Sequence, residues 1–169
     1  LKEARAIPEQ MQKNMKNWRK NAHPMDVLQA FVAALAGYYD EQGTEKEISQ
    51  QRAINLISKV PTIIASWEIV RNDKEPIQPD PELSHASNFL YMLTGNKPDK
   101  EMERVFDVCL ILHADHTFNA STFAAREVAS TRAHMYSAVS AAVGALSGEL
   151  HGGANYEVMK MLLDIKDEN

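Results

Sequence analysis

The sequence predicts an all-α protein, a multi-helical bundle formed by residues 1–169 as a single helical region. Hydrophobic residues make up 44% of the chain and aromatic residues only 7%, with seven glycines and seven prolines. This composition favours Ala, Leu and Met packed between helices over aromatic-rich strands. A chain of this length buries roughly two-thirds of the surface that it exposes when unfolded, which is enough for a full helical core.

The first half of the chain carries helix signals at three places. Pro8 suits the first turn of a short surface helix, and Pro24 suits the start of a second helix with apolar residues at helical spacing. Residues 45–71 form a longer apolar-periodic segment that Pro61 interrupts, which predicts either two helices or one kinked helix. Residues 72–82 hold three prolines and four acids and are predicted to form the longest loop.

The second half begins with a short helix between a Ser84 cap and a Gly95 stop. Pro98 opens the next helix, which has acids in its first turn. Beyond Asn119 we expect two further helices, and no charged residue occurs from Met135 to Gly148, so this helix should be buried on nearly all sides. The apolar side expected for the helix after Pro98 consists of Met102, Val105, Phe106, Cys109, Leu110 and Leu112.

Charge and composition argue against two classes of partner. The formal net charge is −5 and no block of Lys or Arg occurs, which disfavours nucleic-acid binding. No stretch approaches the ~20 apolar residues that cross a bilayer, so no membrane partner is expected. The lone cysteine, Cys109, lies in an apolar run where a free thiol is usually buried, which favours a reducing compartment. We therefore predict a cytoplasmic protein.

His113 and His116 are three residues apart at the end of a predicted helix, so both rings can face one cavity. A simpler interpretation is that the negative end of the helix dipole stabilises them. A zinc site that adds Asp115 or Cys109 is a third interpretation, but the sequence has no HExxH or CxxC motif. No metal site is predicted.

His151 follows the uncharged helix and precedes Gly152 and Gly153. Glycines there permit unusual backbone angles and leave room for a ligand beside the imidazole. Asn155 is a candidate cap for the next helix, which would direct free N–H groups into the same region. The alternative is a simple glycine-rich turn with an incidental histidine.

Two segments carry a resemblance to a known family. HADHTFNASTFAAR, residues 113–126, and LHGGAN, residues 150–155, resemble segments of the citrate synthase family, including its 2-methylcitrate synthase branch. The bacterial and archaeal type is the most similar. The resemblance covers nearly the whole chain, because other family segments follow in the same order, namely HPMDVL, SNFLYMLTG and MYSAVSAAVGALSG.

The resemblance implies part of the large domain of the citrate synthase fold and an acyltransferase activity. The reaction would be the condensation of acetyl-CoA with oxaloacetate, followed by hydrolysis of citryl-CoA to citrate and CoA, a step of the tricarboxylic acid cycle. Catalysis would rest on His151, which hydrogen-bonds the thioester carbonyl as it becomes an enol, and on His116, which holds oxaloacetate. Asn119 would lie at the substrate, and Ser121 and His113 would support the site. The simpler interpretation of Asn119 and Ser121 is that they cap the start of the helix that follows. No cofactor is implied, because acetyl-CoA is a substrate.

The resemblance also indicates what these residues lack. The family's catalytic Asp, its other substrate-binding His and its carboxylate-binding arginines match nothing in this chain, and the small domain is absent, so we expect the fragment to be inactive alone. A homodimer through helices that include Met135 to Gly148 is implied; burial of that helix within one subunit is the alternative. Two other functions stay open: a 2-methylcitrate synthase that uses propionyl-CoA, and a non-catalytic helical dimerisation module.

Overall fold

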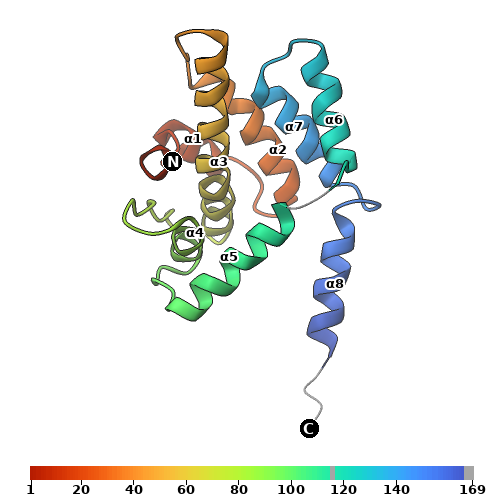
Figure 1. The fold of residues 1–169 in the computed structure, drawn as a ribbon. Coiled ribbons are helices and arrows are strands. Elements are labelled where there is room, and N and C mark those ends of the chain that lie inside the picture. The colour runs from red at the N-terminus through yellow and green to blue at the C-terminus, as the bar shows by residue number, and fades with distance from the viewer. Residues whose placement is uncertain (115–116, 166–169) are drawn as a thin grey trace.

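The computed structural model describes residues 1–114 and 117–165, with the backbone alone at position 155. Within these ranges the regular structure is entirely helical, which confirms the predicted class (Figure 1). The described α-helices are α1 (Glu9–Lys16), α2 (Pro24–Ala34), α3 (Glu45–Arg71), α4 (His85–Thr94), α5 (Lys100–Ala114), α6 (Ala120–Ser130), α7 (Met135–Leu146) and α8 (Gly153–Asp164), with short 3-10 helices at Lys2–Ala4 and Leu35–Gly37.

The hydrophobic core lies where α1, α2, α3 and α7 meet. The shortest of these, α1, was predicted to be a surface helix from its polar composition. It contributes to the core as well, because Met11 and Met15 are fully buried. Unbranched methionine side chains fill irregular gaps between helices, which suits this position. Further buried members of the core come from the other helices and include Val27, Phe31, Val32, Ile63, Trp67, Val70 and Tyr136.

The long apolar segment is one continuous helix, α3, with Pro61 inside it. Thr44 and Glu47 form a capping box at its start: the Glu47 carboxylate accepts from the Thr44 amide at 2.8 Å, and the Thr44 hydroxyl accepts from the Glu47 amide at 3.4 Å. Contrary to the expectation that no stretch could cross a bilayer, α3 is long and apolar enough to do so, and it is the one such helix in the described part of the chain. Half of its apolar window is buried inside the protein, as in the core helix of a globular fold.

The predicted bounds of α4 are confirmed. Ser84 caps the helix, its hydroxyl accepting from the Ser87 amide at 3.1 Å. The helix ends at Gly95, which adopts a left-handed conformation with φ of 80°. A residue with a Cβ is strained there, which explains why a glycine stops this helix.

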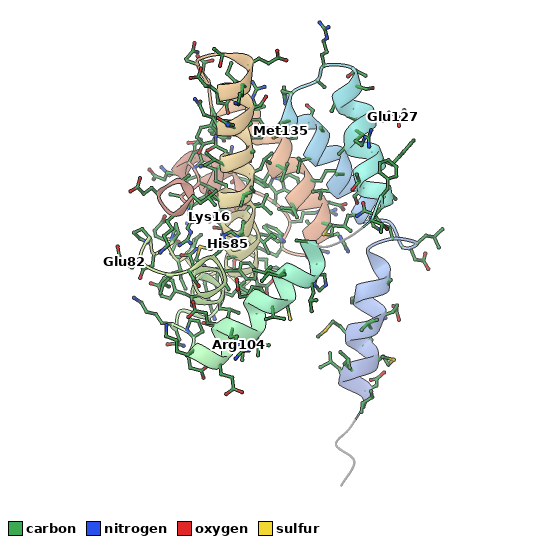
Figure 2. All side chains as sticks on the ribbon, in the orientation of Figure 1. Lys16, Glu82, His85, Arg104, Glu127 and Met135 are labelled. Atoms are coloured by element: carbon green, nitrogen blue, oxygen red, sulfur yellow. The ribbon has the colours of Figure 1, made fainter. Side chains whose placement is uncertain are left out.

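The apolar side of α5 is not buried, contrary to expectation. The helix packs chiefly against α4, where the Phe106 and Phe89 rings stack at 5.3 Å. Cys109 is exposed rather than buried, because no described element covers this side of α5. The last helix, α8, runs away from the bundle, and its side chains stand clear of the other helices in Figure 2. Both helices therefore present large exposed apolar residues, among them Val105, Ile111, Leu112, Met159, Met161 and Leu163.

The helices α6 and α7 form a hairpin that packs on α2 through α7. Small side chains allow the close approach: the Ser140 hydroxyl donates to the Gln29 carbonyl at 3.0 Å, and a Cβ at Gly144 would lie 2.5 Å from the Gln29 amide nitrogen. Tyr136, Ala138 and Ser140 are buried, whereas residues 141–145 are half-buried and Leu146, the last residue of α7, is exposed. The absence of charge on α7 is thus explained in part by packing within the chain.

Candidate functional site

The turn after α7 is held by its own backbone and carries His151. The Gly152 amide donates to the Leu146 carbonyl and the His151 amide to the Gly148 carbonyl, both at 3.0 Å. At Gly152 the chain passes so close to α7 that an added Cβ would collide with the Leu146 carbonyl oxygen. The backbone at His151 is thereby fixed to the end of α7.

The glycines of this turn differ from expectation. Gly152 has φ of −72°, and positive φ occurs among the described glycines only at Gly43 and Gly95. Close approach, not an unusual backbone angle, is what requires glycine at position 152. The helix α8 begins at Gly153, so Asn155 lies inside it and is not its cap.

The structure brings Ser121 and His151 together although thirty residues separate them. The Ser121 Oγ lies 2.7 Å from the His151 Nε2. Both residues are half-buried, Ser121 in the first turn of α6 and His151 beyond α7, so the hairpin creates the contact. When the hydroxyl donates to Nε2, the neutral ring carries its proton on Nδ1. The ring is then oriented with one N–H free to donate to a ligand.

Asn119 and His113 make local contacts at helix ends. Asn119 caps α6, its side-chain oxygen accepting from the Thr122 amide at 2.7 Å, which is the simpler role that its position suggests. Ser121 does not act as the cap. The His113 Nδ1 donates to the Cys109 carbonyl at 2.7 Å, and its ring is exposed at the C-terminal end of α5. The capping hydrogen bond does not test a substrate role for Asn119, which stays a prediction.

His116 and Asp115 lie outside the described residues. The expected convergence of the His116 and His151 rings therefore remains a prediction. Across the two described ranges, no group of three or more His, Cys, Asp or Glu residues is placed to hold a metal ion.

The sequence pointed to His151 through its glycine-rich surroundings and to Ser121 through the family resemblance. It did not indicate why residue 152 is glycine, nor the hydrogen bonds of Tyr136 at the other end of α7. Tyr136 is a buried residue in the first turn of α7 whose hydroxyl donates to Glu41. A tyrosine in an otherwise small-residue helix was the available signal, because a buried hydroxyl requires a partner.

The whole chain matches a family model described as citrate synthase, C-terminal domain, over residues 1–169. A curated citrate synthase from Synechocystis is 48% identical over 152 residues, covering 89% of this chain and 38% of the relative. A citrate/2-methylcitrate synthase from Bacillus subtilis is 45% identical over 149 residues, covering 87% of this chain and 40% of the relative.

A solved structure gives the same result for the fold. The crystal structure of citrate synthase from Pyrobaculum aerophilum has a TM-score of 0.89 and 40% identity to this chain, covering 98% of it and 44% of the solved chain. The chain thus spans about two-fifths of the length of the relatives that it matches. Sequence, family model and helical arrangement agree, and the chain belongs to the citrate synthase family.

Proposed function

We propose that these residues contribute to a citrate synthase, which condenses acetyl-CoA with oxaloacetate and hydrolyses citryl-CoA to citrate and CoA. Family membership supports the reaction class, and the observation that carries the proposal within this chain is the 2.7 Å contact between Ser121 and His151. A hydroxyl orients this histidine, and its turn is fixed to a helix. Both features suit a side chain that stabilises a negative charge as the charge develops on a substrate.

The role of His151 follows from the chemistry of a thioester. Removing a proton from the carbon next to the thioester builds negative charge on the carbonyl oxygen. A pre-aimed imidazole N–H stabilises this charge where it develops, at no cost of reorganisation. With Ser121 donating to Nε2, the Nδ1–H of His151 is the donor. His116 would hold oxaloacetate with Asn119 nearby, and the enol carbon would then attack the ketone.

We further propose that the 169 residues alone do not turn over. In the described part of the chain the His151 ring is hydrogen-bonded to Ser121 and to no carboxylate, so this contact supplies no base to take the proton. The general base and the groups that bind the oxaloacetate carboxylates would come from beyond the matched region, since the relatives are more than twice as long. A cytoplasmic location stays a prediction.

A chimeric enzyme tests the proposed reaction. In this chimera, the chain replaces the matching segment of a curated citrate synthase. We expect CoA release that depends on oxaloacetate, with a higher kcat/KM for acetyl-CoA than for propionyl-CoA, and none from the isolated chain. A folded chimera without activity would contradict the proposal and favour the dimerisation module.

The second candidate is 2-methylcitrate synthase, favoured by the name of the Bacillus subtilis relative. One additional methylene in a hydrophobic pocket changes discrimination by only about 1–3 kcal/mol, so few residues decide between the donors. Because much of the chimera's donor pocket would come from the relative, two chimeras made from relatives with opposite donor preference are compared. A propionyl-CoA preference in both would select this candidate.

We also propose a homodimer through helices that include residues 135–148. The exposed apolar residues Phe123 and Leu146 on the hairpin support this assignment. A large apolar surface is a liability in a monomer. Light scattering after size exclusion should give twice the monomer mass for the chimeric enzyme, and a Leu146→Lys variant should shift it toward monomer. A variant that stays dimeric would show that the interface lies elsewhere on the chain.

A further inference from the structure

A cluster of polar side chains lies beneath the first turn of α7, at the opposite end from His151. Tyr136 is only 1% exposed, and its hydroxyl donates to the Glu41 carboxylate at 2.5 Å. The same hydroxyl accepts from the Asn55 amide at 3.0 Å. Both hydrogen-bonding directions of the tyrosine are therefore used, one toward the loop before α3 and one toward α3 itself.

Glu41 and Asn55, the two partners of Tyr136, each make a further hydrogen bond. The Glu41 side chain is 5% exposed, and its second oxygen accepts from the Arg52 Nε at 3.2 Å. Burial raises the pKa of Glu41, but hydrogen bonds from Tyr136 and Arg52 outweigh it and hold that pKa below its ordinary value. The Asn55 oxygen accepts from the Lys59 ammonium at 2.9 Å. A charged, directional anchor thus connects α7 to α3 and its preceding loop.

Beyond Tyr136, one further side-chain hydrogen bond joins α7 to another helix in the described part of the chain, from the Ser140 hydroxyl to the Gln29 carbonyl of α2. The other residues of α7 are mostly Ala, Ser and Gly, which permit close approach but present few large side chains that interdigitate. Figure 2 labels Met135, the first residue of α7, on the side of the hairpin that faces α3. Hydrogen bonds are directional, so the bonds of Tyr136 restrict rotation at the first turn of α7, as the Ser140 bond does near its middle.

Rotation of α7 changes the position of His151. The helix has 12 residues and a length of about 18 Å, and a helix moves as a rigid element. Backbone bonds join its last turn to His151, and the 2.7 Å distance to Ser121 leaves little room for displacement. Loss of a hydrogen bond at Tyr136 should therefore displace His151 at the opposite end of the helix.

We propose that Tyr136 and Glu41 are positioning residues for His151, which anchor α7 so that the imidazole stays on Ser121. The consequence for catalysis rests on the proposed function, whereas the consequence for the His151 ring does not. The two are tested separately.

The first test uses the 169-residue chain and NMR of its histidine ring nitrogens, with the His151 signals assigned by His151→Ala. Ser121→Ala supplies the reference for a lost hydrogen bond. Tyr136→Phe removes only the hydroxyl, and we expect it to shift the His151 ¹⁵N resonances toward the Ser121→Ala values. The matched control is Tyr38→Phe, which removes a hydroxyl that accepts from the Asn14 amide of α1 at 3.1 Å. This control should leave the His151 signals as in the parent.

A folded Tyr136→Phe chain with unchanged His151 signals overturns the proposal, as does an equal shift in Tyr38→Phe. If circular dichroism shows that Tyr136→Phe does not fold, Glu41→Gln carries the test. This variant keeps the size of the side chain and an acceptor for Tyr136 but removes the charge; a shift of His151 supports the proposal and its absence overturns it.

The second test measures Tyr136→Phe in the chimeric enzyme. Misplacement of a catalytic group by about 1 Å costs up to about 100-fold in rate, so we expect kcat to fall by about 10- to 100-fold with little change in the KM for oxaloacetate. A rise in KM alone would contradict the positioning role. A chimera with no citrate formation refutes the proposed function, while the NMR result on the isolated chain still decides the anchor.

Discussion

His151→Ala is expected to lower the kcat of the chimeric enzyme by about 100- to 10,000-fold. The variant removes the N–H that would stabilise the enolate oxygen, and loss of one such donor or of a general acid has effects of this size. Binding of oxaloacetate should change little, because His151 is assigned to the thioester. Steady-state rates with acetyl-CoA, measured by CoA release, provide the values.

The control for this variant is His23→Asn. His23 is exposed and caps α2, its Nδ1 accepting from the Met25 amide at 3.3 Å, and asparagine is an equally good cap. This variant should retain the parent kcat. Turnover of His151→Ala equal to that of His23→Asn would remove His151 from the chemistry and favour the interpretation of an incidental histidine in a glycine turn.

Gly152→Ala is expected to destabilise the His151 turn by about 1–3 kcal/mol, because the new methyl group forces backbone to move. The obstacle is the Leu146 carbonyl oxygen, which cannot rotate away as the end of a flexible side chain can. The displaced turn takes His151 with it, so kcat in the chimeric enzyme should also fall by up to about 100-fold. Urea unfolding and steady-state kinetics measure the two effects.

The adjacent glycine is the matched control. A Cβ at Gly153 would find its nearest neighbours at 3.9 Å, which is ordinary van der Waals contact, and this residue begins α8. Gly153→Ala should leave kcat unchanged and slightly favour the helix. Equal losses in the two variants would show that the turn is sensitive to any substitution rather than to the approach at position 152.

Local signals predicted local structure well. Ser84 and Gly95 bound α4 as expected, because a hydroxyl cap and a left-handed glycine act within a few residues of the chain. The apolar side of α5 was expected to be buried, and Cys109 with it, yet both are exposed. Periodicity identifies which face is apolar but not whether an element of the same chain covers it.

The candidate site was predictable in part. Motif resemblance selected Ser121 and His151, and their contact depends on a hairpin that the helix signals allow. The collision at Gly152 and the anchor at Glu41 depend on distances between elements, which a single sequence does not contain. A glycine in a turn has two explanations, backbone angle and close approach, and only coordinates separate them.

The free-standing helix α8 has a thermodynamic consequence. An isolated helix of fewer than about 12–15 residues is only marginally stable in water, and α8 has 12 residues with its apolar side chains exposed. Its helix–coil equilibrium should respond to gentle warming well before the bundle melts. The segment just beyond His151 should therefore gain order when a surface buries the apolar side chains of α8.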